Sequence, residues 1–180
     1  NGMLSGVADD ENPLLIPRFA LADGTTLMPL AYFRDVKVEQ SGGRTTITYR
    51  QSEMDRMGGE APAPDQRITL KTTYTYERGL ITRTDVYTPS SKLQIKGIDL
   101  AFGSFSSHPT TSGLTTRFGN GAVEEFSVKG LDRCESAAAA GDKTYQSPNG
   151  PMASKVTCTR AAFDFERPLT LSWRLRYQPE

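Results

Sequence analysis

The chain has 180 residues, a length that suits a single domain with a substantial hydrophobic core. Its 21 basic and 21 acidic side chains cancel, so its charge gives no long-range attraction to nucleic acid or to an anionic membrane. No apolar stretch approaches the roughly 20 residues that span a bilayer. We therefore expect neither a nucleic-acid partner nor a membrane span.

Alternation of apolar and polar residues with a period of two runs through most of the chain, which is typical of β-strands with one face in water. The predicted strands, in chain order, cover residues 34–40, 45–50, 68–76, 80–88, 92–105, 114–118, 123–128, 156–165 and 169–177. Gly42 and Gly43 join the first two strands, and a three-residue turn from Glu77 to Gly79 joins the next two, because hairpin turns need the positive φ that glycine accepts. A phase slip at Gly97 predicts a β-bulge.

These strands and turns predict an all-β fold, namely an antiparallel β-sandwich of the supersandwich or jelly-roll type with about eight to ten strands. We expect residues 13–180 to form this single domain and residues 1–12 to form an extended N-terminal segment. The predicted loops are residues 54–66, 106–113 and 134–154, the last with one helical turn at its alanines. Trp173 alternates with polar residues in the last strand, which predicts that it packs in the core.

The two cysteines, Cys134 and Cys158, lie at the ends of a polar segment rich in alanine and glycine. Two buried thiols or one disulfide fit such a pair, whereas a zinc site needs more ligands in a useful spacing. We expect the disulfide, because the even number and the placement favour it. A disulfide indicates an oxidising compartment, so the sequence predicts a secreted or periplasmic protein.

Residues that carry catalysis or hold metals are scarce. His108 is the sole histidine. A catalytic triad would need an acid partner brought in by the fold, and no nucleophile-elbow motif is present, so we expect His108 to be a solvated loop residue. The acidic run at residues 9–12 lacks the alternate spacing and the glycine of a calcium loop. We therefore predict no catalytic residue, no metal site and no cofactor, and an enzyme is the least favoured hypothesis.

The return strand of the second hairpin carries the candidate ligand-binding residues Arg83, Asp85 and Tyr87. If Leu80 and Val86 face the core, these three share the outward face, because alternate residues of a strand lie on one side. There the guanidinium and the carboxylate can hydrogen-bond sugar hydroxyls, and the ring can stack on apolar C–H groups. The alternative is a solvated face with a cross-strand ion pair.

The stretch from Tyr76 to Tyr87 has a charged turn that ends in glycine, followed by a strand of threonine and branched residues. It resembles the large β-sandwich domains that stand beside helical barrels in polysaccharide lyases of the heparinase type. The resemblance implies a non-catalytic β domain of a carbohydrate-active protein. In such lyases the catalytic Tyr, His and Arg come mostly from the helical domain, so the resemblance assigns no catalytic residue to this chain.

Two hypotheses of function follow from these observations. The first is a non-catalytic β-sandwich module of a secreted or periplasmic carbohydrate-related protein, which binds a polysaccharide or oligosaccharide or braces an adjacent catalytic domain of the same natural chain. The alternative is a purely structural or protein-interaction domain of a cell-envelope protein, with no small ligand.

Overall fold

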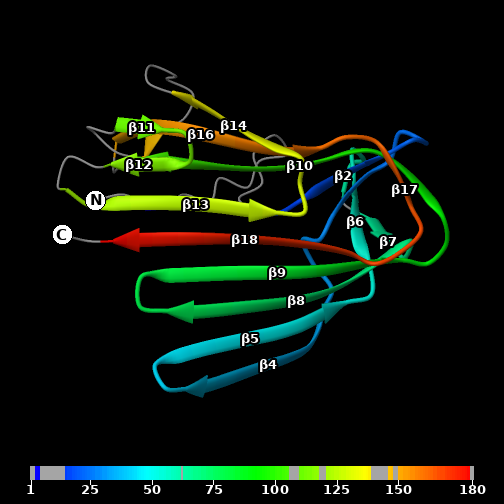
Figure 1. Cartoon of the computed structure of the whole chain (residues 1–180). Helices are drawn as coiled ribbons and strands as arrows, with labels where there is room; N and C mark the ends of the chain where they lie inside the picture. The colour runs from blue at the N-terminus through cyan, green and yellow to red at the C-terminus, as the bar shows by residue number, and fades with distance from the viewer. Residues whose placement is uncertain are drawn as a thin grey trace.

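The structure, a computed structural model, describes residues 3–4, 15–61, 63–105, 110–117, 121–138, 146–147 and 150–178. This part of the chain forms eighteen β-strands in two antiparallel sheets and contains no helix (Figure 1). It accordingly holds no helix that is long and apolar enough to cross a membrane. The prediction of an all-β antiparallel sandwich is confirmed. The strands outnumber those predicted, because nine of them span only two to four residues.

Two sheets, which we call sheet A and sheet B, form the layers of the sandwich. The order in sheet A is β14 (Arg133–Ala138), β16 (Gly150–Arg160), β10 (Leu93–Phe105), β2 (Arg18–Leu21), β3 (Thr26–Met28), β6 (Met54–Met57) and β7 (Ala63–Asp65). Three short strands pair beside this path, namely β1 (Met3–Leu4), β15 (Gln146–Ser147) and β17 (Phe163–Phe165). The order in sheet B is β11 (Thr110–Ser112), β12 (Thr115–Arg117), β13 (Val123–Lys129), β18 (Leu169–Gln178), β9 (Leu80–Pro89), β8 (Ile68–Glu77), β5 (Arg44–Gln51) and β4 (Phe33–Ser41).

The N-terminal segment predicted over residues 1–12 is described only at Met3 and Leu4, which pair with β10. Residues 1–2 and 5–12 lie outside the described part of the chain. The division into this segment and a single domain over residues 13–180 therefore stays a prediction.

Both predicted hairpins are present, as β4–β5 and β8–β9. The second has a two-residue turn, Arg78 and Gly79, instead of the predicted three-residue turn, so Glu77 pairs with Leu80. Gly79 has a φ of 71°, and a Cβ there would lie 2.5 Å from the carbonyl oxygen of Tyr177. The Tyr177 amide donates a hydrogen bond to the Gly79 carbonyl at 2.8 Å, which ties this turn to β18.

The predicted loop at residues 54–66 is wrong in part, because it contains β6 and β7. Met54 is fully buried in the core. The carboxylate of Asp55 accepts hydrogen bonds from the backbone amides of Leu30 and Ala31, each at 2.9 Å. Burial and pairing with β3 thus stabilise short strands in a segment whose glycines and prolines favour a loop.

The predicted loop at residues 134–154 is also wrong in part, because it contains β14, β15 and the start of β16. The predicted helical turn is contradicted where the chain is described, since β14 continues as strand through Ala138. Residues 139–145 lie outside the described part. Pairing with β16 across six consecutive positions outweighs the helix propensity of alanine.

Three further expectations concern strand boundaries. The register of β10 against β2 shifts between Ile95 and Gly97, which confirms the predicted bulge. The predicted strand at residues 156–165 is interrupted between β16 and β17. The predicted loop at residues 106–113 contains β11, and residues 106–109, with His108, lie outside the described part.

The hydrophobic core lies between the sheets and forms two clusters. The first consists of Phe19, Leu21, Leu27, Met54, Ile68, Leu70, Tyr87, Ile95, Ile98, Phe165 and Leu171. The second consists of Leu15, Leu100, Phe126, Val156, Cys158, Trp173 and Leu175. Trp173 is only 6% exposed, and its indole nitrogen donates to the Leu15 carbonyl at 3.2 Å. The predicted core position of Trp173 is therefore confirmed.

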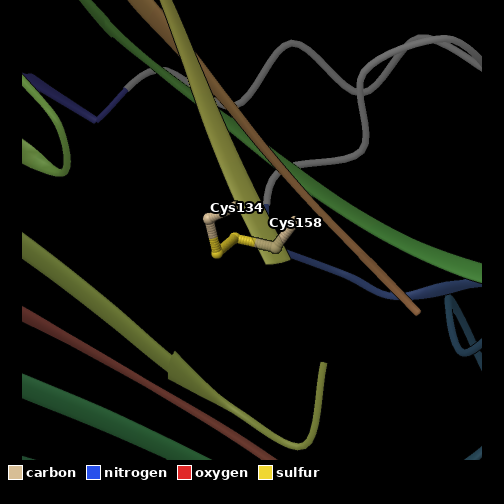
Figure 2. Close-up of a disulfide and its surroundings, with 2 residues drawn as sticks. All are labelled: Cys134 and Cys158. Carbon is tan, nitrogen blue, oxygen red and sulfur yellow. A yellow bond between two sulfur atoms is a disulfide. The ribbon is translucent and has the colours of Figure 1, made fainter. Parts of the chain in front are cut away.

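Cys134 and Cys158 form the predicted disulfide (Figure 2). They are directly opposite partners on β14 and β16, with their Cα atoms 4.0 Å apart. Cys158 is fully buried, so the bond anchors the edge strand β14 to the second core cluster.

Candidate functional site

Arg83, Asp85 and Tyr87 share one face of β9, as predicted, but that face is the buried one. Their exposed fractions are 3%, 1% and 0%, so the predicted outward placement is wrong. The length of the turn explains the error. Compared with the predicted three-residue turn, the two-residue turn changes the register of β9 against β8 by one residue. A shift of one residue exchanges the two faces of a strand. Tyr87 therefore pairs with Leu70, a core residue of β8.

A hydrogen-bond network holds these side chains inside the sandwich. Arg83 Nε donates to both carboxylate oxygens of Asp85, at 3.0 and 2.8 Å. The same carboxylate accepts from the Tyr87 hydroxyl at 3.1 Å and from the Thr72 hydroxyl at 2.6 Å. Arg83 Nη1 donates to the Tyr74 hydroxyl at 2.9 Å. Buried charges are tolerated when they are paired and hydrogen-bonded. The Asp85 carboxylate meets that condition, whereas Arg83 Nη2 is buried without a hydrogen-bond partner among the described residues.

Burial sets the protonation of this network. It raises the pKa of Tyr87 well above its usual value and that of Tyr74 to about 12. Burial alone would lower the pKa of Arg83, but the adjacent Asp85 carboxylate and the neighbouring tyrosines together more than offset it, and the pKa lies above its usual value. The phenols and the guanidinium therefore keep their protons at neutral pH. The network is a fixed polar support and not a site of proton transfer.

The inner face of sheet B carries a row of four aromatic rings, which we call the aromatic strip: Phe33, Tyr49, Tyr74 and Tyr76. Along the row, neighbouring ring centroids are 5.0, 6.4 and 6.0 Å apart. The rings of Tyr74 and Tyr76 are nearly parallel, with 18° between their planes. Tyr74 also meets Trp173 edge-on at 6.1 Å. The aromatic strip is thus an outward continuation of the core.

Both ends of the aromatic strip are open to solvent. Phe33 is 51% exposed and Tyr76 is 38% exposed. On β4, Val36 and Val38 are 58% and 59% exposed. Figure 1 shows β4 and β5 at the opposite side of sheet B from β13, and away from β14 and β16 of sheet A. We identify this open part of the inner face as the candidate functional site.

The aromatic strip is not among the sites predicted from the sequence. The sequence does contain a pattern that points to it, because Tyr74 and Tyr76 alternate on one predicted strand and Tyr49 lies on a neighbouring one. The alternation shows that such residues share a face, but their exposure depends on how far sheet A extends over sheet B. Among the described residues, no group of three His, Cys, Asp or Glu side chains could hold a metal ion. The acidic run at residues 9–12 lies outside them.

No protein-family profile and no curated protein matches the chain. Solved structures match it in fold. The chain is similar to a mutant of heparan sulfate lyase HepC from Pedobacter heparinus, with a TM-score of 0.54 and 8% sequence identity, over 82% of this chain and 22% of the lyase. It is also similar to a heparinase III with methylated lysines, with a TM-score of 0.52 and 11% identity, over 81% of this chain and 21% of that one.

The chain spans about a fifth of the length of these two lyases. At such low identity the likeness shows the fold alone. It confirms the resemblance on which the sequence analysis drew, because the matched part covers four fifths of this chain. The chain therefore has the fold of a β-sandwich domain of heparinase-type lyases.

Proposed function

We propose that this chain is a non-catalytic β-sandwich module of a carbohydrate-related protein and that the aromatic strip binds glycan. The observation that carries the proposal is the pair of nearly parallel rings of Tyr74 and Tyr76, 6.0 Å apart, in which Tyr76 is exposed and Tyr74 is half-buried. Aromatic faces stack on the apolar C–H faces of sugars. The exposed ring of Tyr76, with the nearly parallel ring of Tyr74 beside it, supplies such a stacking surface in this proposal.

The buried network supports this platform from beneath. Tyr74 accepts a hydrogen bond from Arg83 Nη1, and the guanidinium carbon of Arg83 lies 5.2 Å from the centre of the Tyr74 ring. Both contacts fix the ring before any ligand arrives. A ring held in place loses less conformational entropy on binding than a free one, which improves affinity.

The proposed module acts outside the cytoplasm. The disulfide between Cys134 and Cys158 supports this placement, because disulfides persist in oxidising compartments. The fold supports the link to polysaccharides, since the solved structures that share it are named as a heparan sulfate lyase and as a heparinase III. A secreted or periplasmic polysaccharide-related protein is consistent with both observations.

A second candidate is a docking face for an adjacent domain of the same natural chain. The exposed aliphatic side chains of Val36 and Val38 beside the aromatic strip favour it, because contiguous apolar surface often marks a protein interface. This chain matches only 22% and 21% of the two lyases, which also fits a module that has adjacent domains in the same natural chain.

Titration with neutral oligosaccharides tests the first candidate. We expect Tyr76→Ala to weaken binding about tenfold, which corresponds to about 1.4 kcal/mol of lost stacking. Tyr76→Phe keeps the ring and should keep most of the affinity. Leu80→Ala is the matched control, because Leu80 lies on the outer face of the same hairpin. Equal affinity of the wild type and Tyr76→Ala would remove the aromatic strip as the glycan site.

Hydroxyl-radical footprinting of the natural full-length protein tests the second candidate. If an adjacent domain covers the strip, Phe33 and Tyr76 should be protected in the natural chain and reactive in this domain alone. Protection together with an absence of glycan binding would favour the docking face. Equal reactivity in the two proteins would exclude it.

A further inference from the structure

The outer face of sheet B carries three basic residues in one row across three neighbouring strands. Arg34 of β4 is the register partner of Arg50 of β5, and Arg50 is the register partner of Lys71 of β8. All three side chains are exposed. We call them the cationic row. Since adjacent strands are about 4.8 Å apart, the row spans about 10 Å from its first residue to its last.

This arrangement is unfavourable for folding by itself. Like charges directly opposite each other on neighbouring strands destabilise a sheet. Among the residues that the structure describes, no carboxylate forms an ion pair with any member of the row. Asp35 lies beside the row without such a pair. The repulsion within the row is therefore not offset by an ion pair in the described part of the chain.

A groove of about 460 Å³ lies along the cationic row. Besides the three cations, its lining includes the hydroxyl-bearing residues Thr69 and Thr88 and one acidic residue, Asp35, so the groove carries a net positive charge. Its volume is within the range of about 300–1,000 Å³ that small-molecule sites occupy. The groove thus combines cationic donors with hydroxyl groups that both donate and accept hydrogen bonds.

We propose that this groove is a binding site for an acidic oligosaccharide. A carboxylate or sulfate group of the ligand pairs with Arg50 and with a flanking cation, and the sugar hydroxyls bond to Thr69 and Thr88. Arginine suits this role, because its planar fork of donors matches an oxyanion in two-point contact. The site is on the opposite face of sheet B from the aromatic strip and does not rest on the function proposed for that strip.

Calorimetric titration tests the proposal with four probes: an oligogalacturonate, a sulfated oligosaccharide, a neutral oligosaccharide and inorganic polyphosphate. We expect the acidic sugars to bind more weakly as salt rises, and the neutral sugar not to bind the groove. Arg50→Gln should weaken acidic-sugar binding about tenfold, the effect of losing one charge-assisted hydrogen bond. Arg50→Lys keeps the charge but loses the fork, so it should restore only part of the affinity.

Lys37→Gln is the matched control, because Lys37 is an exposed cation of β4 outside the groove lining. An equal loss in Lys37→Gln and Arg50→Gln would overturn the proposal, since net charge alone would then explain binding. Polyphosphate binding as tight as that of the acidic sugars would overturn it too, because the hydroxyl contacts would then contribute nothing. Failure of both acidic sugars to bind would likewise overturn it. Tyr76→Ala should leave acidic-sugar binding unchanged, and a loss there would place the site on the aromatic strip instead.

Discussion

The two faces of the β8–β9 hairpin place charged residues in opposite situations. On the inner face, Arg83 and Asp85 form a salt bridge at 2.8 Å with side chains that are 3% and 2% exposed. On the outer face, Lys71 stands beside Arg50 with no ion pair in the described part of the chain. The inner charges neutralise each other in a salt bridge within the fold. The outer charges repel each other, and a ligand from outside can relieve the repulsion.

The polarity of a strand face alone therefore does not show whether that face is buried. The inner face of this hairpin carries two charged residues in its middle, Arg83 and Asp85, yet they are only 3% and 1% exposed. What makes burial tolerable is the complete set of hydrogen bonds to the Asp85 carboxylate. Four experiments test this contrast between the two faces.

Removal of Asp85 should have a very large effect. Asp85→Ala leaves the guanidinium of Arg83 buried and without its carboxylate, and we expect a loss of about 3–5 kcal/mol in the free energy of unfolding. Thr84→Ala, one residue away on the outer face, should change it by less than about 0.5 kcal/mol. Urea unfolding measures both. A joint replacement of Arg83 and Asp85 by leucine should cost less than Asp85→Ala alone. A greater cost for the double variant would contradict the account of the buried pair.

Trp173→Ala should have an effect of similar size, about 3–5 kcal/mol, because it empties a large site in the second core cluster. The neighbouring Arg174 points to the outer face and is exposed, so Arg174→Ala should change stability by less than about 0.5 kcal/mol. Denaturant midpoints of the two variants give the contrast directly. Similar midpoints for both variants would mean that Trp173 contributes little to the core.

High pH should weaken the inner face by a smaller amount. Burial raises the pKa of Tyr74 to about 12 in the folded state, against about 10 in the unfolded chain. The unfolded state therefore releases this proton first, and stability is full below about pH 10 and falls as pH rises toward 12. We expect Tyr74→Phe to reduce this fall in the free energy of unfolding. An unchanged slope would show that Tyr74 titrates as an exposed phenol does.

Neutralisation of the outer row should have the smallest effect, and of the opposite sign. Arg50→Gln removes repulsion toward both neighbours, so it should raise the free energy of unfolding by about 0.2–1 kcal/mol. The gain should shrink in high salt, because salt screens exposed charges. Thermal unfolding at two salt concentrations measures it. Destabilisation at low salt would show that the cationic row supports the fold.

Much of the fold followed from local pattern. The alternation of Ile68 and Leu70 with polar residues marked β8, and the glycine turns marked both hairpins. Short strands such as β6 were missed, because a segment of a few residues has too little periodic signal and becomes a strand only when a partner strand pairs with it. The same limit applied to β14, whose alanines favour a helix in isolation.

For the ligand-binding residues predicted on β9, the length of one turn was decisive. With the two-residue turn of the structure, Leu70 pairs with Tyr87 and Thr72 pairs with Asp85. A hairpin with a core residue at Leu70 therefore places Tyr87 and Asp85 inside. The three-residue turn predicted from sequence moves each partner by one position and puts the same residues outside. The sequence pattern was correct about which residues share a face and wrong about which face is buried.

Period-two alternation and backbone freedom at glycine are local properties of the sequence. They are sufficient to predict that the chain is all-β, that its strands form hairpins at glycine turns and that Trp173 belongs to the core. Only the tertiary structure decided that Arg83 and Asp85 are buried, that the aromatic strip is open and that Arg34, Arg50 and Lys71 form one row. Those outcomes depend on strand register and on how far one sheet covers the other, and both are set by contacts between residues that are distant in the sequence.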